Sequence, residues 1–393
     1  MTSAGVARCI NEALPEEVFG VIFEEHAKLE WKAPLIDEQV CRQWRQTILC
    51  SPRAWAHMEI GYSFRSAPSK LHQWLDRSGS APLHIQIIDW HQDVEKALDQ
   101  HCKRIQSIVL RRDHIAFLEN RSFPILQSLT IESLNISTPV RRWSASGAMP
   151  ALRSLQANYI SLGALPSNIF PLLRALALST VHDCDSIIRN SYHSLTSLML
   201  GYISLQDTSE SLELPSLIFL SLFSVKNIKH RMNVPALTTY HESGIMERES
   251  FSVSLPSLIE YGIYRPHEES PFNVTKLHQC YPNISRLSTR ARPSTVKLFL
   301  RSLSSQPTAL PMLQMLAVDV VYSSTIYSGE DKESMMNDVS VRNMASSVKM
   351  ELYFDGKVRS PLYFGIVRDY INHGQSKLTS TPSTRIFTIE DGL

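Results

Sequence analysis

The chain has 393 residues and a formal net charge of +1, because 39 lysines and arginines nearly balance 38 aspartates and glutamates. This balance leaves no global basic field for nucleic acid or for an acidic membrane surface. Hydrophobic residues make up 43% of the sequence, which is ordinary for a globular chain and far from disorder. We therefore expect two or three domains, or one repeat array with a small appendage, and no nucleic acid or membrane partner.

Six cysteines are scattered along the chain without a C-x-x-C pair. This usage is typical of a reducing compartment with free thiols, rather than of a disulfide framework or a zinc site. The first 20 residues contain three glutamates and lack the apolar core of a signal peptide. We expect a cytoplasmic or nuclear protein, or one found in both, with no cofactor and no metal.

Residues 1–13 are expected to form a flexible arm, and residues 14–58 a small helical domain. The first predicted helix repeats apolar residues at the spacing of a single helical face, namely Leu14, Val18, Phe19, Ile22 and Phe23. The second predicted helix, which Ser51-Pro52 ends, also has one apolar face, formed by Val40, Cys41, Trp44, Ile48 and Leu49. Trp55 adds a further large apolar group. A unit this small buries too little surface to be stable alone, so it usually needs a partner.

This stretch resembles the F-box, and its order and spacing look most like the F-box-like group of mushroom-forming fungi. The resemblance rests on four pieces, which are Leu14-Pro15-Glu16-Glu17-Val18, Ile22-Phe23, Val40-Cys41-Arg42-Gln43-Trp44-Arg45 and Trp55. The match covers about 45 residues. The segment from Leu35 to Gln39 departs from the family because it is more acidic than the apolar run usual there. The alternative is a plain helical hairpin that caps the next domain.

The resemblance implies an adaptor of an SCF-type ubiquitin ligase. Its helices would bind a Skp-type linker protein, which docks on cullin, and the rest of the chain would hold a protein substrate. Catalysis would belong to other subunits. The residues that the resemblance assigns to linker binding are Leu14, Pro15, Val18, Ile22, Phe23, Val40, Cys41, Trp44 and Trp55.

Residues 71–104 are expected to link the helical domain to the C-terminal part of the chain through a helix, a strand and a helix. Leu71, Trp74 and Leu75 begin a short helix that Gly79 can close in the left-handed conformation. The alternation of Leu83, Ile85 and Ile87 predicts a strand. The second helix is indicated by Val94, Leu98 and Cys102.

From residue 105 to 322 the sequence repeats a Pro-x-Leu-x-x-Leu-x-apolar unit. Nine copies run from PILQSLTI at 124–131 to PMLQMLAV at 311–318, with a mean spacing of about 23 residues. This period is in the range of leucine-rich repeats, in which each unit buries its leucines against its neighbours. Coincidence in a leucine-rich chain is the alternative. We expect an α+β repeat fold, with an F-box-like helical unit followed by an irregular leucine-rich-repeat-like α/β solenoid.

The units differ from the standard leucine-rich pattern just after each strand, where an asparagine usually satisfies the turning backbone. Here that position is apolar, as Leu134, Ile160, Val181, Ile203, Val225 or Val321. We therefore expect no polar ladder, and turns that are closed by apolar packing.

Residues 341–393 are expected to form a C-terminal cap. Residues 323–340 are rich in Ser, Glu and Asp and are predicted to form a loop, and Val348 to Phe354 alternate as a strand. A helix with Tyr363, Ile366 and Tyr370 on one face and a last strand at 385–389 are predicted beyond them.

No motif for catalysis is found, so we expect a protein that is not an enzyme. The sequence lacks a Gly-rich phosphate loop, a nucleophile elbow and an H-E-x-x-H pair. The run His182-Asp183-Cys184-Asp185 has metal-binding residue types but no second cluster, so a polar loop is the favoured interpretation. Arg286, Arg290 and Arg292 form a basic patch, either solvated or a contact for an acidic peptide or phosphate.

The side chains that alternate with the core leucines should form one outward face. Early units present small residues there, whereas later ones present aromatic and charged residues typical of binding surfaces, namely Phe219, Phe223, His241, Tyr264, Arg286 and Arg290. Phe219 and Phe223 are equally well explained as rings covered by a loop or by the cap. A repeat scaffold that binds proteins outside any ubiquitin ligase is the alternative function.

Overall fold

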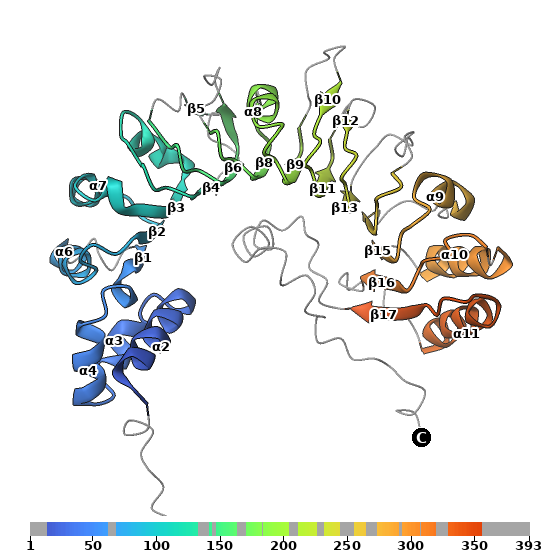
Figure 1. Cartoon of the computed structure of the whole chain (residues 1–393), viewed down its shortest axis with the longest axis horizontal. Helices are drawn as coiled ribbons and strands as arrows, with labels where there is room; N and C mark the ends of the chain where they lie inside the picture. The colour runs from blue at the N-terminus through green and yellow to red at the C-terminus, as the bar shows by residue number, and fades with distance from the viewer. Residues whose placement is uncertain are drawn as a thin grey trace, which may run out of the picture. The chain divides into compact units, whose positions relative to one another are not determined.

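The structure is a computed structural model that describes residues 14–61, 68–132, 141–143, 147–162, 170–182, 184–203, 211–225, 232–243, 255–264, 273–290, 293–306, 308–319 and 329–355. Contacts divide the chain into two compact units, Met1–Leu172 and Leu173–Leu393. Each unit is a mixed α/β structure built on parallel strands (Figure 1).

Unit one begins with three short helices, α2 (Glu16–Leu29), α3 (Ala33–Asp37) and α4 (Arg42–Leu49), and the 3-10 helix η1 (Ala54–Ala56). Pro15 precedes α2, and its carbonyl accepts hydrogen bonds from the N–H groups of Val18 and Phe19. Glu16 and Glu17 lie in the first turn, where the helix dipole favours negative charge.

The strands of unit one run parallel in the order β1 (His57–Ile60), β2 (Leu83–Ile87), β3 (Ile105–Arg111), β4 (Ser128–Glu132) and β6 (Ser154–Asn158). Helix α6 (Pro68–Arg77) precedes β2, and α7 (Gln92–Asp99) precedes β3, as the sequence predicts. The boundary predicted at residue 105 is not a division of the structure, because β3 pairs with both β2 and β4. The other elements are η2 (Cys102–Arg104), η3 (Arg112–Leu118) and the paired strands β5 (Arg141–Trp143) and β7 (Ile160–Leu162).

Unit two also arranges its main strands parallel and in chain order. They are β8 (Ala175–Ser179), β9 (Ser197–Gly201), β11 (Phe219–Phe223), β13 (Thr239–Ser243), β14 (Glu260–Tyr264), β15 (Arg286–Arg290), β16 (Met315–Asp319) and β17 (Glu351–Asp355). The helices between them are α8 (Asp185–Asn190), α9 (Val274–Cys280), α10 (Pro293–Ser305) and α11 (Gly329–Ala345). A small parallel pair joins β10 (Leu212–Glu213) to β12 (Met232–Asn233).

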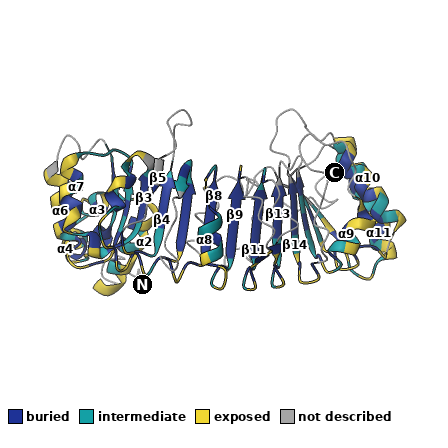
Figure 2. Cartoon of the chain, turned by 90° about the horizontal axis from the view of Figure 1, so that it is seen from above, coloured by how far each residue is buried: buried dark blue, intermediate teal, exposed yellow. Residues whose placement is uncertain are grey.

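The predicted leucines form the interior of unit two. Leu176, Leu198 and Leu220 are direct partners in the strand register, and each is at most 1% exposed. The strands that carry them are dark blue in Figure 2, the colour of buried residues. Burial of this column therefore holds neighbouring strands together, and the same column continues through Tyr240 and Tyr261.

A polar ladder exists, but it lies before the strands rather than after them. The Ser194 hydroxyl donates to the Leu173 carbonyl at 2.7 Å, and the Ser216 hydroxyl donates to the His193 carbonyl at 3.0 Å. Later turns use the same kind of bond, from Ser257 to Pro235 and from Asn283 to Pro256. The expectation concerned a ladder after the strands, so this ladder before them was not predicted; in each bond a side chain of the later turn satisfies a carbonyl of the earlier one.

The turns after the strands are closed by apolar packing, as the sequence predicts. Ile160, Val181, Ile203 and Val225 are each at most 4% exposed. The residue directly before each of them has a positive φ between 49° and 53°; these residues are Tyr159, Thr180, Tyr202 and Ser224. The chain thus reverses through one left-handed residue, and a buried aliphatic residue then fixes the turn.

Thr180→Asn is expected to raise the free energy of unfolding by about 1 kcal/mol. Left-handed backbone costs an ordinary residue about 1–2 kcal/mol, and the penalty is severe for a β-branched one, whereas asparagine tolerates it. Urea unfolding of the full chain measures the change. Thr308→Asn is the matched control, since Thr308 is exposed and has no positive φ. A lower midpoint for Thr180→Asn would contradict the prediction.

The predicted loop at 323–340 was wrong, because α11 occupies residues 329–345. Its buried residues Met335, Val339 and Arg342 lie at helical spacing. Arg342 is 1% exposed, and its guanidinium donates to the carbonyls of Leu310 and Val348. A short apolar stripe that ends in a buried arginine explains why hydrophobic periodicity missed this helix.

The strand predicted from Val348 is found as β17. Several predictions lie outside the described residues, namely the arm at 1–13, the helix around 363–371, the strand at 385–389 and the turn residues Leu134 and Val321.

Candidate partner-binding surfaces

Helix α2 has two apolar faces rather than one. Phe19 and Phe23 are 2% and 1% exposed and pack against the ring of Trp44, with ring centroids 5.8 Å and 5.2 Å away. Val18 and Ile22, which directly precede Phe19 and Phe23 in the chain, are 39% and 42% exposed. The single stripe predicted from the sequence therefore divides into a core face and a solvent face.

Further exposed apolar side chains occur on α3, between α3 and α4, and at the end of α4. Each exposed apolar side chain in this part of unit one has at least 39% of its surface in water; the set is Val18, Val21, Ile22, Leu29, Ile36, Val40 and Leu49. On α2, Val21 and Ile22 lie three and four positions after Val18, and Leu29 lies seven after Ile22, which places all four along one side of the helix. We call this set the apolar helix surface.

The predicted linker-binding residues fall into three groups. Pro15, Val18, Ile22 and Val40 are exposed. Leu14, Cys41 and Trp44 are half-buried, and the Cys41 sulfur caps α4 by accepting the Trp44 N–H at 3.4 Å. Phe23 and Trp55, at 1% and 0% exposure, are core residues of the free chain, so their assignment to linker binding stays a prediction.

The acidic segment that departs from the F-box pattern is used inside the unit. Asp37 is 5% exposed, and its carboxylate lies 3.0 Å from Nδ1 of His26 on α2. Glu38 lies 3.6 Å from the Arg77 guanidinium on α6. These carboxylates tie α3 to its neighbours, and Ile36 is left 53% exposed beside them.

Tryptophans join the helical segment to the strands of unit one. The Trp55 ring packs edge-on against Trp74 of α6 at 4.9 Å, and its N–H donates to the Ile48 carbonyl at 2.8 Å. The Arg77 guanidinium lies 4.3 Å from the centre of the Trp55 ring. This packing gives the helices α2–α4 a defined position on α6.

A second candidate surface is the outward face of the strands in unit two. On β8, β9 and β11 this face is buried, because Ala177, Met199 and Phe219 form one cluster at 0%, 8% and 4% exposure. Phe219 is therefore a packed residue, and the neighbours named here lie on adjacent strands rather than on a loop or in the cap. Phe223 is half-buried and meets Tyr202 edge-on at 4.5 Å.

The outward face becomes charged at β13, β14 and β15. His241 Nε2 lies 3.1 Å from one Glu260 oxygen, and Arg286 lies 3.4 Å from the other. Burial alone would raise the pKa of Glu260, but the hydrogen bond from His241 and the charges of His241 and Arg286 bring that pKa below its usual value. Glu260 is therefore ionised and fixes both partners. Tyr264 and Arg290 lie on these strands, and their side chains are outside the described residues.

Gly262 makes the charged cluster possible. It is the register partner of both His241 and Ser288, and a Cβ atom there would lie 2.7 Å from the His241 ring and 2.9 Å from the Ser288 hydroxyl. Because Gly262 has no side chain, the His241 imidazole can pass over it and reach Glu260 on the same strand, β14.

A buried glutamate on the interior face was not predicted. Glu242 is 1% exposed, and its two oxygens accept the hydroxyls of Tyr240 at 2.6 Å and Tyr261 at 2.8 Å. Burial and the Glu242 charge raise the pKa of Tyr240 well above its ordinary value, so its hydroxyl remains a donor. The sequence gives only a weak indication of this glutamate. In PALTTYHE, at 235–242, tyrosine replaces the last leucine of the repeat unit and glutamate replaces its final apolar residue.

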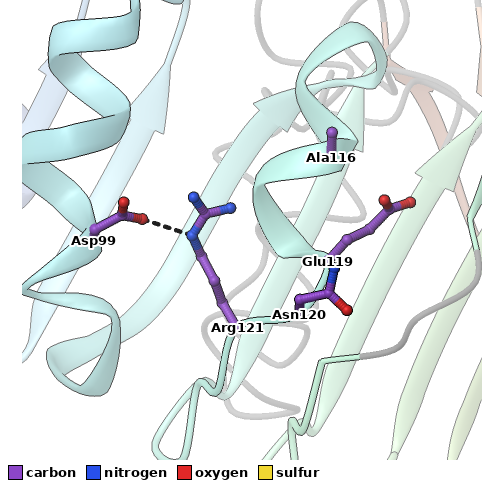
Figure 3. Close-up of a pocket in the computed structure, with 5 residues that line it drawn as sticks. All are labelled: Asp99, Ala116, Glu119, Asn120 and Arg121. Atoms are coloured by element: carbon purple, nitrogen blue, oxygen red, sulfur yellow. Dashed lines mark hydrogen bonds and ion pairs between the residues drawn. The ribbon is translucent and has the colours of Figure 1, made fainter.

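A depression of about 510 Å³ in unit one is lined by Asp99, Ala116, Glu119, Asn120 and Arg121 (Figure 3). Arg121 donates to Asp99 at 2.6 Å, to Glu95 at 2.8 Å and to the Phe117 carbonyl at 2.8 Å. Its guanidinium is thus engaged in tethering α7, and the lining supplies little apolar surface for a ligand.

The described residues offer no metal site. No group of three or more His, Cys, Asp or Glu side chains converges among them, and Cys184 of the predicted polar run is 2% exposed. No helix in the described part of the chain is both long and apolar enough to cross a membrane.

Comparisons with known proteins give no assignment. No protein-family model matches the sequence, and no curated protein matches it significantly. The function must therefore be inferred from the two surfaces described above.

Proposed function

We propose that residues 14–58 are an F-box-like unit that binds a Skp-type linker protein, and that the chain is the substrate-recognition adaptor of an SCF-type ubiquitin ligase. One observation carries the proposal, which is the apolar helix surface of seven exposed side chains within residues 18–49. Apolar surface gathered in this way marks a site of protein interaction. The resemblance of the same residues to the F-box supplies the kind of partner.

The parallel strands are proposed to be an irregular leucine-rich-repeat-like α/β solenoid that holds the substrate. Support comes from strands that follow chain order, and from the buried residues Leu198, Leu220 and Tyr240, which are register partners on three successive strands. Among the predicted substrate contacts whose side chains are described, Arg286 keeps 42% of its side chain exposed and Phe223 is half-buried. The accessible substrate face is therefore proposed to lie at Phe223 and at the charged cluster.

In this function the chain performs no chemistry of its own. It would raise the effective concentration of a substrate lysine near a conjugating enzyme that other subunits bring. The packing of Trp55, Trp74 and Arg77 supports this role, because it fixes the helices that bind the linker on α6.

Ile22→Glu with Val40→Glu is expected to weaken linker binding at least tenfold. Both side chains are exposed, so the free chain should fold normally, whereas the complex would bury two unpaired carboxylates. Titration calorimetry of the full chain with a purified Skp-type linker measures the affinity, and thermal melting checks the fold.

Leu298→Glu with Met344→Glu is the matched control. These residues of α10 and α11 are 48% and 81% exposed, so the control adds the same charge to apolar surface elsewhere. It should leave linker affinity unchanged. If the parent chain shows no linker binding, or if both double variants bind like the parent, the repeat scaffold outside a ligase becomes the better assignment.

A further inference from the structure

Two imidazole rings are stacked where the helical segment of unit one joins its strands. His57, the first residue of β1, and His84 of β2 are register partners in the parallel pair. Their ring centroids are 4.4 Å apart and the ring planes differ by 6°. This geometry brings two titratable groups into face-to-face contact, and two imidazolium ions so close would repel each other.

The charged groups that act on the pair come from the second half of α2. Lys28 disfavours protonation of both rings, and Glu24 favours protonation of His84. The carboxylates near Lys28 are engaged, because Lys28 pairs with Glu24 at 3.2 Å and Glu25 at 2.7 Å, and Glu24 also pairs with Arg53 at 3.6 Å. Glu24, the carboxylate that acts on His84, is therefore already shared between Lys28 and Arg53.

Burial of the two rings also disfavours their protonation. It lowers the pKa of His57 to about 3 and also lowers the pKa of His84, with the charge of His84 and of Lys28 adding to the effect on His57. Both rings are thus neutral at pH 7 in the folded chain.

We propose that the His57–His84 stack is an acid-sensitive latch that holds β1, and with it the helical segment, on β2. The latch is closed when both rings are neutral and opens locally when they gain protons. The inference stands apart from the proposed function, since it concerns only the junction inside unit one.

The pH dependence of the stability of the latch follows from the difference between the pKa values of its open and closed forms. An imidazole in the opened form has the ordinary value near 6.5, above that of the closed form. The contribution of the latch is therefore complete above about pH 6.5, and it is lost as the pH falls from there toward 3.

Hydrogen exchange of the full chain tests the latch. After correction for intrinsic exchange, protection of the amides in 57–60 and 83–87 should fall at least tenfold between pH 7.5 and pH 5. In His57→Phe with His84→Phe the rings still stack but do not titrate, so protection should change less than twofold. His72→Phe, at an exposed position on α6, is the control and should behave like the parent.

Imidazole NMR titration of the unmodified chain gives a second reading that does not depend on how the variants fold. Two histidine signals should titrate below the ordinary value of 6.5, that of His57 near pH 3. Both signals should be missing from the double variant. If that variant does not fold, one of them should be missing from His84→Phe. Ordinary titration near pH 6.5 at both rings would overturn the proposal. So would an equal loss of protection in the parent and the double variant.

Discussion

Trp55→Ala should lower the free energy of unfolding of unit one by about 3–5 kcal/mol, the range for removing a fully buried aromatic side chain. Trp55 is 0% exposed and packs on Trp74, and its N–H satisfies the Ile48 carbonyl. Truncation leaves a cavity between α4 and α6 and removes the ring beneath Arg77. Urea unfolding followed by circular dichroism measures the loss.

Trp31→Ala is the matched comparison for this variant. Trp31 is half-buried and contacts the same Trp74 at 5.6 Å, so a smaller loss is expected. Trp55→Phe keeps an aromatic ring in the core and should retain linker binding. If Trp55→Ala instead kept the stability of the parent and lost the linker, the ring would be a direct contact, as the F-box resemblance implies.

Helix α2 shows why the sequence alone could locate the candidate binding unit but not its surface. Val18, Phe19, Ile22 and Phe23 are all apolar, so periodicity finds the helix and cannot tell which pair faces inward. The choice is made by Trp44, whose ring packs on the two phenylalanines and leaves the smaller residues in water. That contact depends on how α2 and α4 pack, which no local pattern encodes.

The strands of unit two were predictable because leucine at a fixed spacing is a local signal. Leu198 and Leu220 are interior residues, as their positions predict. The interior polar groups were not predictable, because Glu242 is stable there only through Tyr240 and Tyr261, whose hydroxyls lie on two neighbouring strands. A buried carboxylate requires such partners, and residues 19 positions apart reveal that pairing only in the fold.

On the outward face, residues with the same sequence pattern differ in burial. Phe219 and Phe223 alternate with interior leucines and looked alike in the sequence, yet one is packed and the other half-buried. The distinction comes from lateral neighbours, since Met199 and Ala177 continue the cluster beside Phe219 while Tyr202 stands beside Phe223.

Phe219→Ala should therefore lower the free energy of unfolding by about 3–5 kcal/mol, whereas Phe223→Ala should cost about 1 kcal/mol. The first change removes a ring that is 4% exposed and contacts the His241 ring edge-on at 5.6 Å. The second removes one partner of an aromatic pair in which Tyr202 is already 57% exposed. Chemical unfolding of the two single variants of the full chain, compared side by side, gives both values.

The pair of variants also decides where a substrate can bind. If Phe219 is part of the packed face, Phe219→Ala lowers the stability of the chain, and any loss of partner binding is a consequence of unfolding. Phe223→Ala should keep its fold, so a binding defect in that variant would place the partner at the Tyr202–Phe223 edge. A stable Phe219→Ala variant that fails to bind its partner would show instead that the Phe219 ring is accessible, and the packed cluster with Met199 and Ala177 would then have to open on binding.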